Sequence, residues 1–270
     1  MELKDIASVS GKGGLFRIVA PAKSGVILES LDAAKTKLVA SAQHRISVLH
    51  EISIYTTTAE GTVPLEDVLK KLAKLNIHTV ELGTGNYPGD PHCKLSMLEN
   101  KAELSEFKKK LADHGVTISA LSSHGNPLHP DADRARQDRE VSRRTIQLAE
   151  QLGVPVVIDF SGCPGDSPNA KYPNWVTCPW PPEYLDVLRW QWEEVATPYW
   201  VEHGKFADDH GVKVAIEMHP GFLAYSPETM LRLREIAGPS VGCNYDPSHM
   251  FWQGIDPIAA IRVLGDAIFH

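Results

Sequence analysis

Carboxylate and imidazole side chains recur at five places in this sequence, each directly after a short apolar segment. The last of these places contains Asp246 and His249, three positions apart. Grouped by the segment they follow, the chemically active residues are Glu81; His124, Asn126 and His129; Asp166; Glu217 and His219; and Asp246 and His249. One such group alone would mean little, but five in succession predict a shared site.

Glutamate, aspartate and histidine side chains can together bind one divalent metal ion, because oxygen and imidazole donors suit several such ions. The ion polarises a carbonyl or hydroxyl oxygen and stabilises the negative charge that develops there. A carboxylate in the same group can then move a proton at the carbon next to the carbonyl. The residue types therefore favour metal-assisted proton transfer.

The apolar segments that precede these residues are typical of buried strands that alternate with helices. Strands are expected at 79–83, 116–122, 154–161, 212–218, 241–246 and 267–270, and helices at 64–75, 103–114, 136–152, 185–210, 227–237 and 257–264. Such alternation predicts an α/β fold with a parallel sheet. No G-x-G-x-x-G run follows a strand, so a (β/α)8 TIM-barrel-like fold over 61–270 is favoured over a dinucleotide-binding fold. Barrel strands open into one funnel at their carboxyl ends, which would bring the five groups together.

Residues 1–60 have a different pattern. Short β-rich segments at 15–20, 25–30, 37–40 and 52–55 are separated by turn residues. Several short strands within so few residues predict a small, SH3-like β-rich domain before the barrel.

The composition excludes several classes of protein. Hydrophobic residues make up 43% of the chain and charged residues 23%, which is typical of a globular protein. The net charge of −7 argues against a nucleic-acid partner. No apolar run is long enough to cross a membrane, and the acidic start of the chain does not fit a secretory leader. We therefore expect a cytoplasmic protein whose four cysteines are free thiols.

The longer motifs in 65–270 resemble the sugar phosphate isomerase/epimerase family, the xylose-isomerase-like TIM barrels. The motifs are VELGTGNYPGDPHC (80–93), ISALSSHGNPLHP (118–130), FSGCPGD (160–166), KYPNWVTCPWPP (171–182), IEMHPGF (216–222) and NYDPSHMFWQGIDP (244–257). The resemblance implies a divalent-metal-dependent isomerase or epimerase that acts on a sugar, a sugar phosphate or a polyol. The metal would be Mn²⁺, Mg²⁺ or Zn²⁺.

The resemblance also implies roles for individual residues. Glu217 and Asp246 match the metal-binding carboxylates of the family, and Glu217 also matches its catalytic acid/base. His124 and His249 match imidazoles that touch the substrate. Further candidates for substrate binding, from their positions after strands, are Glu81, Asn126 and His219. For Glu81, a structural ion pair is an equal alternative.

The sequence departs from the family pattern at both ends of the barrel. The seventh strand of the family carries an H-x-H pattern, of which only the first histidine, His270, has a match here. The eighth strand and its glutamate have no match, and 52–55 is the only candidate for the first strand. We therefore expect an incomplete, C-terminally truncated barrel. The segment 1–60 resembles a small bacterial domain of unknown function.

Two other functions stay open. Phosphodiesterases of the same superfamily bind three zinc ions, but they need histidines after the second strand, where this sequence has ELGTG (81–85). Alternatively, a truncated barrel would be inactive and act as a binding or oligomerisation module. Its open strand edges would favour a homo-oligomer. The tryptophans between 175 and 192 are expected to pack in the core in part and to line the substrate pocket in part.

Overall fold

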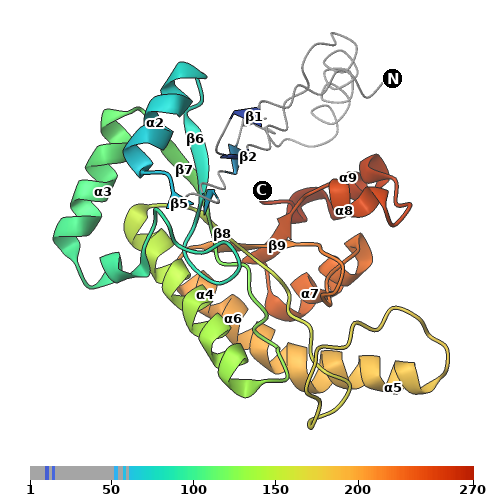
Figure 1. Cartoon of the computed structure of the whole chain (residues 1–270). Coiled ribbons are helices and arrows are strands. Elements are labelled where there is room, and N and C mark those ends of the chain that lie inside the picture. The colour runs from blue at the N-terminus through green and yellow to red at the C-terminus, as the bar shows by residue number, and fades with distance from the viewer. Residues whose placement is uncertain (1–9, 12–13, 16–51, 54–56, 59–60) are drawn as a thin grey trace.

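The computed structural model describes residues 10–11, 14–15, 52–53, 57–58 and 61–270 (Figure 1). Two short antiparallel strand pairs lie in its first part. They join β1 (Ser10–Gly11) to β2 (Gly14–Leu15), and β4 (Thr57–Thr58) to β5 (Gly61–Thr62). The predicted SH3-like domain otherwise falls outside the described residues, so this domain and its boundary at residue 60 stay predictions.

A six-stranded parallel sheet forms the centre of the described region. Its strands lie side by side in chain order, which is the arrangement that successive βα units produce. They are β3 (Ile52–Ser53), β6 (Thr79–Gly83), β7 (Thr117–Ser122), β8 (Val156–Asp159), β9 (Lys213–Glu217) and β10 (Val241–Asn244). The predicted α/β fold is thereby confirmed. The parallel pairing of β3 with β6 places Ile52–Ser53, within the candidate segment 52–55, in the strand position before β6.

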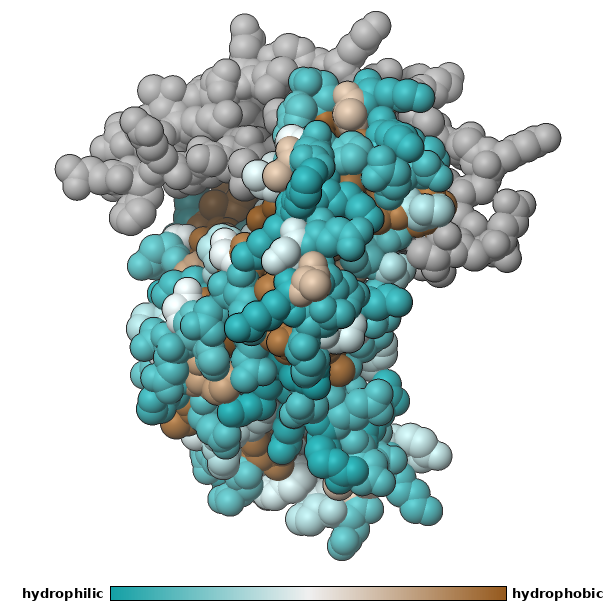
Figure 2. Space-filling view, turned by 90° about the vertical axis from the view of Figure 1, so that its left-hand side faces the viewer, coloured by the Kyte–Doolittle hydropathy of each residue, from teal (hydrophilic) through white to brown (hydrophobic). Residues whose placement is uncertain are grey.

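Helices pack against one face of this sheet, and the side of the molecule drawn in Figure 2 is mainly hydrophilic. The helices of the described residues are α2 (Leu65–Lys74), α3 (Lys101–Asp113), α4 (Ala132–Leu152), α5 (Glu183–Trp190), α6 (Thr197–Asp209), α7 (Pro227–Ala237), α8 (Ser248–Phe251) and α9 (Pro257–Leu264). Of these, α5 extends away from the sheet and has no buried residue (Figure 1). Side-chain oxygens cap several of the helices. Asp131 accepts hydrogen bonds from two backbone N–H groups and starts α4 at Ala132, four residues before the expected start at 136.

No helix in the part of the chain that the structure describes is both long and apolar enough to span a membrane. The cytoplasmic location and the homo-oligomer stay predictions.

The expected single helix over 185–210 is interrupted. A π-helical segment, η3 (Gln191–Ala196), separates α5 from α6. Pro198 lies just after this segment and has no backbone N–H, so the regular hydrogen-bond ladder cannot continue through it. The Thr197 hydroxyl instead donates to the carbonyl oxygen of Trp192 at 2.7 Å. The hydrophobic spacing did not reveal this irregularity.

The two faces of the sheet bury different side chains, as strand alternation requires. The face toward the helices belongs to the main core, in which Trp192 and Trp200 are 1% and 0% exposed. The opposite, inner face carries a small cluster. Its members are Ala120, Val156, Ile158 and Ala215, with Phe269 packed against them.

The sheet curves around its inner face as a barrel does. The imidazole of His270, on the free edge of β10, lies 3.4 Å from the Ser119 hydroxyl on β7. In a flat sheet the four strand spacings between them would amount to about 19 Å. The expected strand at 267–270 is limited to one parallel bridge between Ile268 and Cys243. The preceding residues form a 3-10 turn, η4 (Gly265–Ala267), instead of the start of a strand.

Candidate active site

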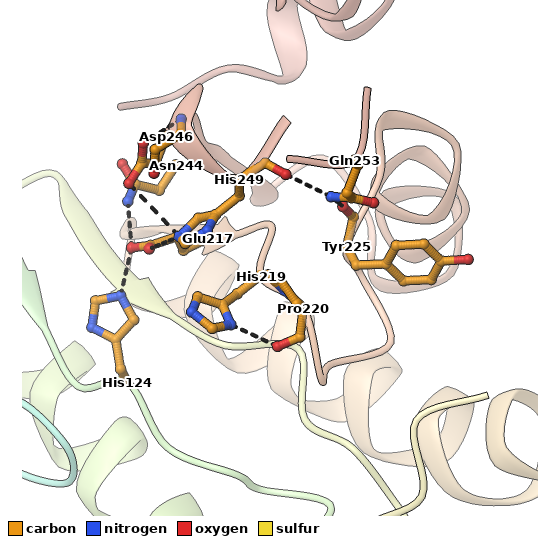
Figure 3. A network of polar contacts seen from close by, with 10 residues as sticks. His124, Glu217, His219, Pro220, Tyr225, Asn244, Asp246, His249 and Gln253 are labelled. Carbon is orange, nitrogen blue, oxygen red and sulfur yellow. Dashed lines mark hydrogen bonds and ion pairs between the residues drawn. The ribbon is translucent and has the colours of Figure 1, made fainter. Parts of the chain in front are cut away.

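Glu217 lies at the centre of a polar network at the carboxyl end of the sheet (Figure 3). It is the last residue of β9, two positions after Ala215, so its side chain is on the inner face. Its Oε2 atom lies 3.0 Å from His124 Nε2 and accepts a hydrogen bond from Asn244 Nδ2 at 3.1 Å. Its Oε1 atom lies 3.1 Å from His249 Nε2. Because a carboxylate only accepts, both imidazole nitrogens carry the hydrogen in these contacts.

Asp246 and His249 form a group of three possible metal ligands with Glu217. One donor atom from each residue lies within 4.8 Å of the others. Asp246 accepts the N–H of Ser248 at 2.8 Å, and Ser248 is the first residue of the short helix α8, which carries His249. Two carboxylates and an imidazole suit a divalent cation such as Mn²⁺, Mg²⁺ or Zn²⁺. Sequence reasoning gave His249 a substrate-binding role, whereas the geometry groups it with the candidate metal ligands.

His124 contacts Glu217 from the opposite side of the network. It follows β7 and is 9% exposed. Its backbone carbonyl accepts the N–H of Tyr87 at 2.9 Å, and the ring of Phe160 meets its imidazole edge-on at 4.5 Å. Burial alone would lower the pKa of His124, but the hydrogen bond to Glu217 and the charges of Glu217, Glu81 and Asp159 together outweigh burial and raise it. His124 is therefore a buried hydrogen-bond donor held against a carboxylate.

The hydrogen bonds that Glu217 accepts from His124 and His249 also determine the pKa of its carboxyl group. Burial alone would raise the pKa of this carboxyl group, but the hydrogen bonds from His124 and His249 outweigh it. The net pKa lies well below the ordinary value. Glu217 is therefore ionised at neutral pH, which a metal ligand or a proton acceptor requires.

His219 and Glu81 lie beside this network. The ring of His219 is 4.3 Å from that of His249, and its Nδ1 atom bonds to the carbonyl oxygen of Pro220 at 2.6 Å. Glu81 lies on β6, half-buried, and its charge adds to that of Glu217 in raising the pKa of His124. His219, which follows β9, and Glu81, which lies within β6, are thus both beside the candidate ligands.

Two of the sequence candidates have other partners. Asn126 is 3% exposed, and its amide donates to the carbonyl of Cys163 and accepts the N–H of the same residue, at 3.0 and 2.9 Å. This side chain therefore joins the loops that follow β7 and β8. His129 accepts the N–H of Asp131 at 2.9 Å, at the start of α4. The structure thus engages both side chains in holding loops together.

Sequence reasoning did not single out Asn244 and Phe160, which complete the site. Asn244 is paired with Glu217 across β9 and β10. The ring of Phe160 stacks on that of Phe222 at 4.2 Å and lies 5.1 Å from that of His219. Both residues lie at strand ends, which was the signal available in the sequence.

The tryptophan-rich region is divided between the core and the surface, and the lining of a substrate pocket stays a prediction. Trp192 belongs to the core, whereas Trp180 is 74% exposed. The ring of Trp175 lies 5.2 Å from that of Tyr225 and 6.5 Å from that of Trp252. These three rings come from the loops after β8, β9 and β10, so they lie at the same end of the sheet as Glu217.

Comparison with known proteins covers most of the chain. A family model described as xylose isomerase-like TIM barrel matches residues 69–270, and the model of a domain of unknown function, DUF5606, matches residues 3–49. The uncharacterized protein YfiH of Bacillus subtilis (strain 168) is 44% identical over 220 residues, which cover 80% of this chain and 70% of that protein. These matches confirm both resemblances that the motifs indicated.

Solved structures share the fold at low sequence identity. The probable 3-DHS dehydratase AsbF of Bacillus anthracis has a TM-score of 0.56 at 17% identity, over 82% of this chain and 71% of that one. A xylose isomerase-like TIM barrel protein of Mycobacterium smegmatis, in complex with magnesium, scores 0.55 at 18% identity, over 77% and 68%. The D-psicose 3-epimerase of Clostridium cellulolyticum H10, with D-tagatose, scores 0.52 at 16% identity, over 76% and 66%. These likenesses concern the fold.

Proposed function

The chain belongs to the xylose isomerase-like TIM barrel family, and from this membership we propose that it is a divalent-metal-dependent isomerase or epimerase. Its substrate is a sugar or a sugar phosphate, and the reaction is a proton transfer at a carbon next to a carbonyl. The observation that carries the proposal is the group of Glu217, Asp246 and His249 at the carboxyl end of the sheet.

Glu217, Asp246 and His249 would hold the metal. Their donor atoms are close enough to share one ion, and two carboxylates offset its charge. A bound divalent ion supplies polarisation of the substrate's carbonyl or hydroxyl oxygen. The donor set fits Mn²⁺, Mg²⁺ or Zn²⁺.

Glu217 is the residue that we assign to proton transfer. It is ionised, as a carboxylate must be to accept a proton from carbon. His124 Nε2 holds Oε2 in place at 3.0 Å. Glu217 therefore has both a fixed position and the required charge.

The surroundings of this group support a sugar as the substrate. The rings of Phe160 and Phe222 provide an apolar surface beside His124, on which the C–H groups of a sugar can pack. His219 and Glu81 add polar groups that can bind hydroxyls. The D-psicose 3-epimerase that shares the fold offers an analogy for such a substrate.

Metal binding is tested first with Glu217→Gln. The Kd for Mn²⁺ is measured by calorimetry on the wild type, on this variant and on Glu235→Gln, a matched control on the exposed surface of α7. We expect Glu217→Gln to abolish measurable binding and the control to match the wild type. Unchanged affinity in Glu217→Gln would overturn the assignment of the site.

Proton transfer is tested separately by solvent exchange. The Mn²⁺-loaded protein is incubated in D₂O with D-fructose, D-tagatose, D-psicose and the 6-phosphates of these sugars. Mass spectrometry then detects deuterium at carbon. We expect incorporation into at least one sugar with the wild type and Glu235→Gln, and none with Glu217→Gln. Absence of incorporation by the metal-loaded wild type across this panel would overturn the proposed reaction.

A further inference from the structure

A buried carboxylate, that of Asp159, lies behind the site on the side of the helices. Asp159 is the last residue of β8 and is 1% exposed. Val156 and Ile158 of the same strand face the inner cluster, so strand alternation places Asp159 on the opposite face. Burial of a charged group is costly unless the group is fully hydrogen-bonded. The partners of Asp159 therefore indicate what the carboxylate is for.

One oxygen of Asp159 accepts hydrogen bonds from both of the loops that carry His124 and Phe160. Its Oδ1 atom accepts the N–H of Gly125 at 3.2 Å and the N–H of Phe160 at 2.8 Å. Gly125 directly follows His124 in the chain, and the ring of Phe160 lies against the His124 imidazole. A single atom thus holds the backbone on both sides of this ring contact.

The carboxylate of Asp159 also faces a hydroxyl-imidazole chain between α4 and α6. Its Oδ2 atom accepts from the Ser123 hydroxyl at 3.5 Å, and the carboxylate is hydrogen-bonded to Ser142 on α4. Ser142 Oγ lies 3.2 Å from Nε2 of His203, which is 1% exposed on α6. The Ser142 hydroxyl has one hydrogen, which it gives to the carboxylate, so it accepts from His203 Nε2–H. Asp159 is thereby fixed to the helices as well as to the loops.

We propose that Asp159 is a positioning residue that holds His124 and Phe160 in place against Glu217. The inference rests on the proposed function, in which Glu217 moves the proton and His124 holds its Oε2 atom. Asp159 does not reach the reacting atoms. It acts through the backbone of Gly125 and Phe160, so the location of its acceptor oxygen matters more than its charge.

Two variants of Asp159 separate the effect of the position of its acceptor oxygen from the effect of its charge. Asp159→Asn keeps an oxygen at the Oδ1 position and removes the charge, and its amide can donate to Ser142. Asp159→Glu keeps the charge and moves the oxygens by one methylene group. Asp208→Asn is the control, because Asp208 also accepts a hydroxyl hydrogen bond, from Ser240 at 2.6 Å, but at the opposite end of the sheet. Thermal melting and circular dichroism establish that each variant is folded.

Three quantities are measured on each folded variant. They are the rate of deuterium incorporation into the sugar that the wild type accepts, the Kd for Mn²⁺, and the His124 Nε2 to Glu217 Oε2 distance in a crystal structure, 3.0 Å in the wild type. We expect Asp159→Asn and Asp208→Asn to keep the rate within about threefold. We expect Asp159→Glu to lower kcat by more than about tenfold with an unchanged Kd and a displaced His124.

Several outcomes would overturn the inference. The first two are a wild-type rate in Asp159→Glu and an undisplaced His124 in that variant. The third is a loss of rate in Asp159→Asn as large as that in Asp159→Glu, which would show that the charge of Asp159 matters. A weakened Mn²⁺ affinity in Asp159→Glu would point to general disruption of the site and would also count against it. Affinity and distance need no substrate, so they test the positioning role even if the wild type fails to exchange deuterium and the proposed function fails.

Discussion

Asn244 lies directly opposite Glu217 on the neighbouring strand, and its amide nitrogen donates to Glu217 Oε2 at 3.1 Å. Its amide oxygen lies 2.9 Å from His270 Nδ1, which fixes the orientation of the amide. His124 bonds to the same carboxylate oxygen. Asn244 and His124 therefore hold Oε2 from two sides, while Oε1 is directed toward His249.

The first prediction concerns the hydrogen bond by which Asn244 orients Glu217, a candidate metal ligand. Asn244→Ala leaves all three candidate ligands in place but frees one side of the Glu217 carboxylate. Loss of such an orienting partner typically weakens metal affinity 10- to 100-fold, so we expect the Kd for Mn²⁺ to rise by about tenfold. Calorimetry on this variant and on Asn100→Ala, which removes only the cap of α3, checks the prediction. An unchanged Kd in Asn244→Ala would show that Asn244 does not orient Glu217.

The second prediction separates two neighbouring histidines. His249 Nε2 lies 3.1 Å from Glu217 and 3.7 Å from Asp246, whereas His219 uses Nδ1 on the carbonyl of Pro220. We expect His249→Ala to raise the Kd for Mn²⁺ by more than the roughly tenfold rise predicted for Asn244→Ala, because His249 is itself a candidate ligand. We expect His219→Ala to change this Kd by less than about threefold. Equal losses in both variants would show that His219 also supports the metal.

Much of the site was predictable because strand ends in this fold have a common direction. Glu217, Asp246 and His124 each follow an apolar segment, and apolar segments that alternate with helices form parallel strands. Parallel strands that curve into a barrel bring their carboxyl ends together. Sequence pattern and chain order were therefore sufficient to predict which segments meet.

Side-chain partners were not predictable, because they depend on distances of a few tenths of an ångström. Asn126 and His249 both follow strands, yet Asn126 turns to the backbone of Cys163 while His249 turns to Glu217. Asp159 looks like one more strand-end carboxylate, but the alternation of a four-residue strand directs it to the helices. The phase of that alternation depends on where the strand begins, and strand boundaries are the least reliable part of a sequence prediction.

The third prediction tests the packing of α6 on α7. A Cβ atom added to Gly204 would lie 2.0 Å from the backbone oxygen of Ala237. In an open helix, Gly→Ala stabilises by about 1 kcal/mol, but here the helices must separate, and we expect a loss of about 2 kcal/mol in the free energy of unfolding. Urea denaturation measures it. Gly115→Ala is the control, because Gly115 has a φ of +64° but no atom near its added Cβ, and should cost about 1 kcal/mol. A stabilised Gly204→Ala would contradict the close contact.

The fourth prediction concerns the pH dependence of stability that Asp159 causes. Burial raises the pKa of this carboxyl group from 3.8 to about 6, despite the hydrogen bonds that it accepts. A raised pKa in the folded state means that the folded protein binds the proton more tightly than the unfolded chain. Its contribution to stability is therefore complete below pH 3.8 and is lost as the pH rises through 6.

Comparing the wild type with Asp159→Asn isolates the pH dependence of stability that Asp159 causes. The variant lacks this carboxyl group but keeps all other titratable groups. Relative to the variant, we expect the wild type to be about 2 kcal/mol more stable at pH 4.5 than at pH 7.5, from the linkage of the two pKa values. Urea unfolding of both proteins without added metal, at half-unit steps of pH, measures this difference. A difference that does not vary with pH would mean that burial and hydrogen bonding balance at Asp159. An increase with pH would mean that the donors of Gly125, Phe160 and Ser142 outweigh burial and stabilise the carboxylate, which reverses the sign of the shift.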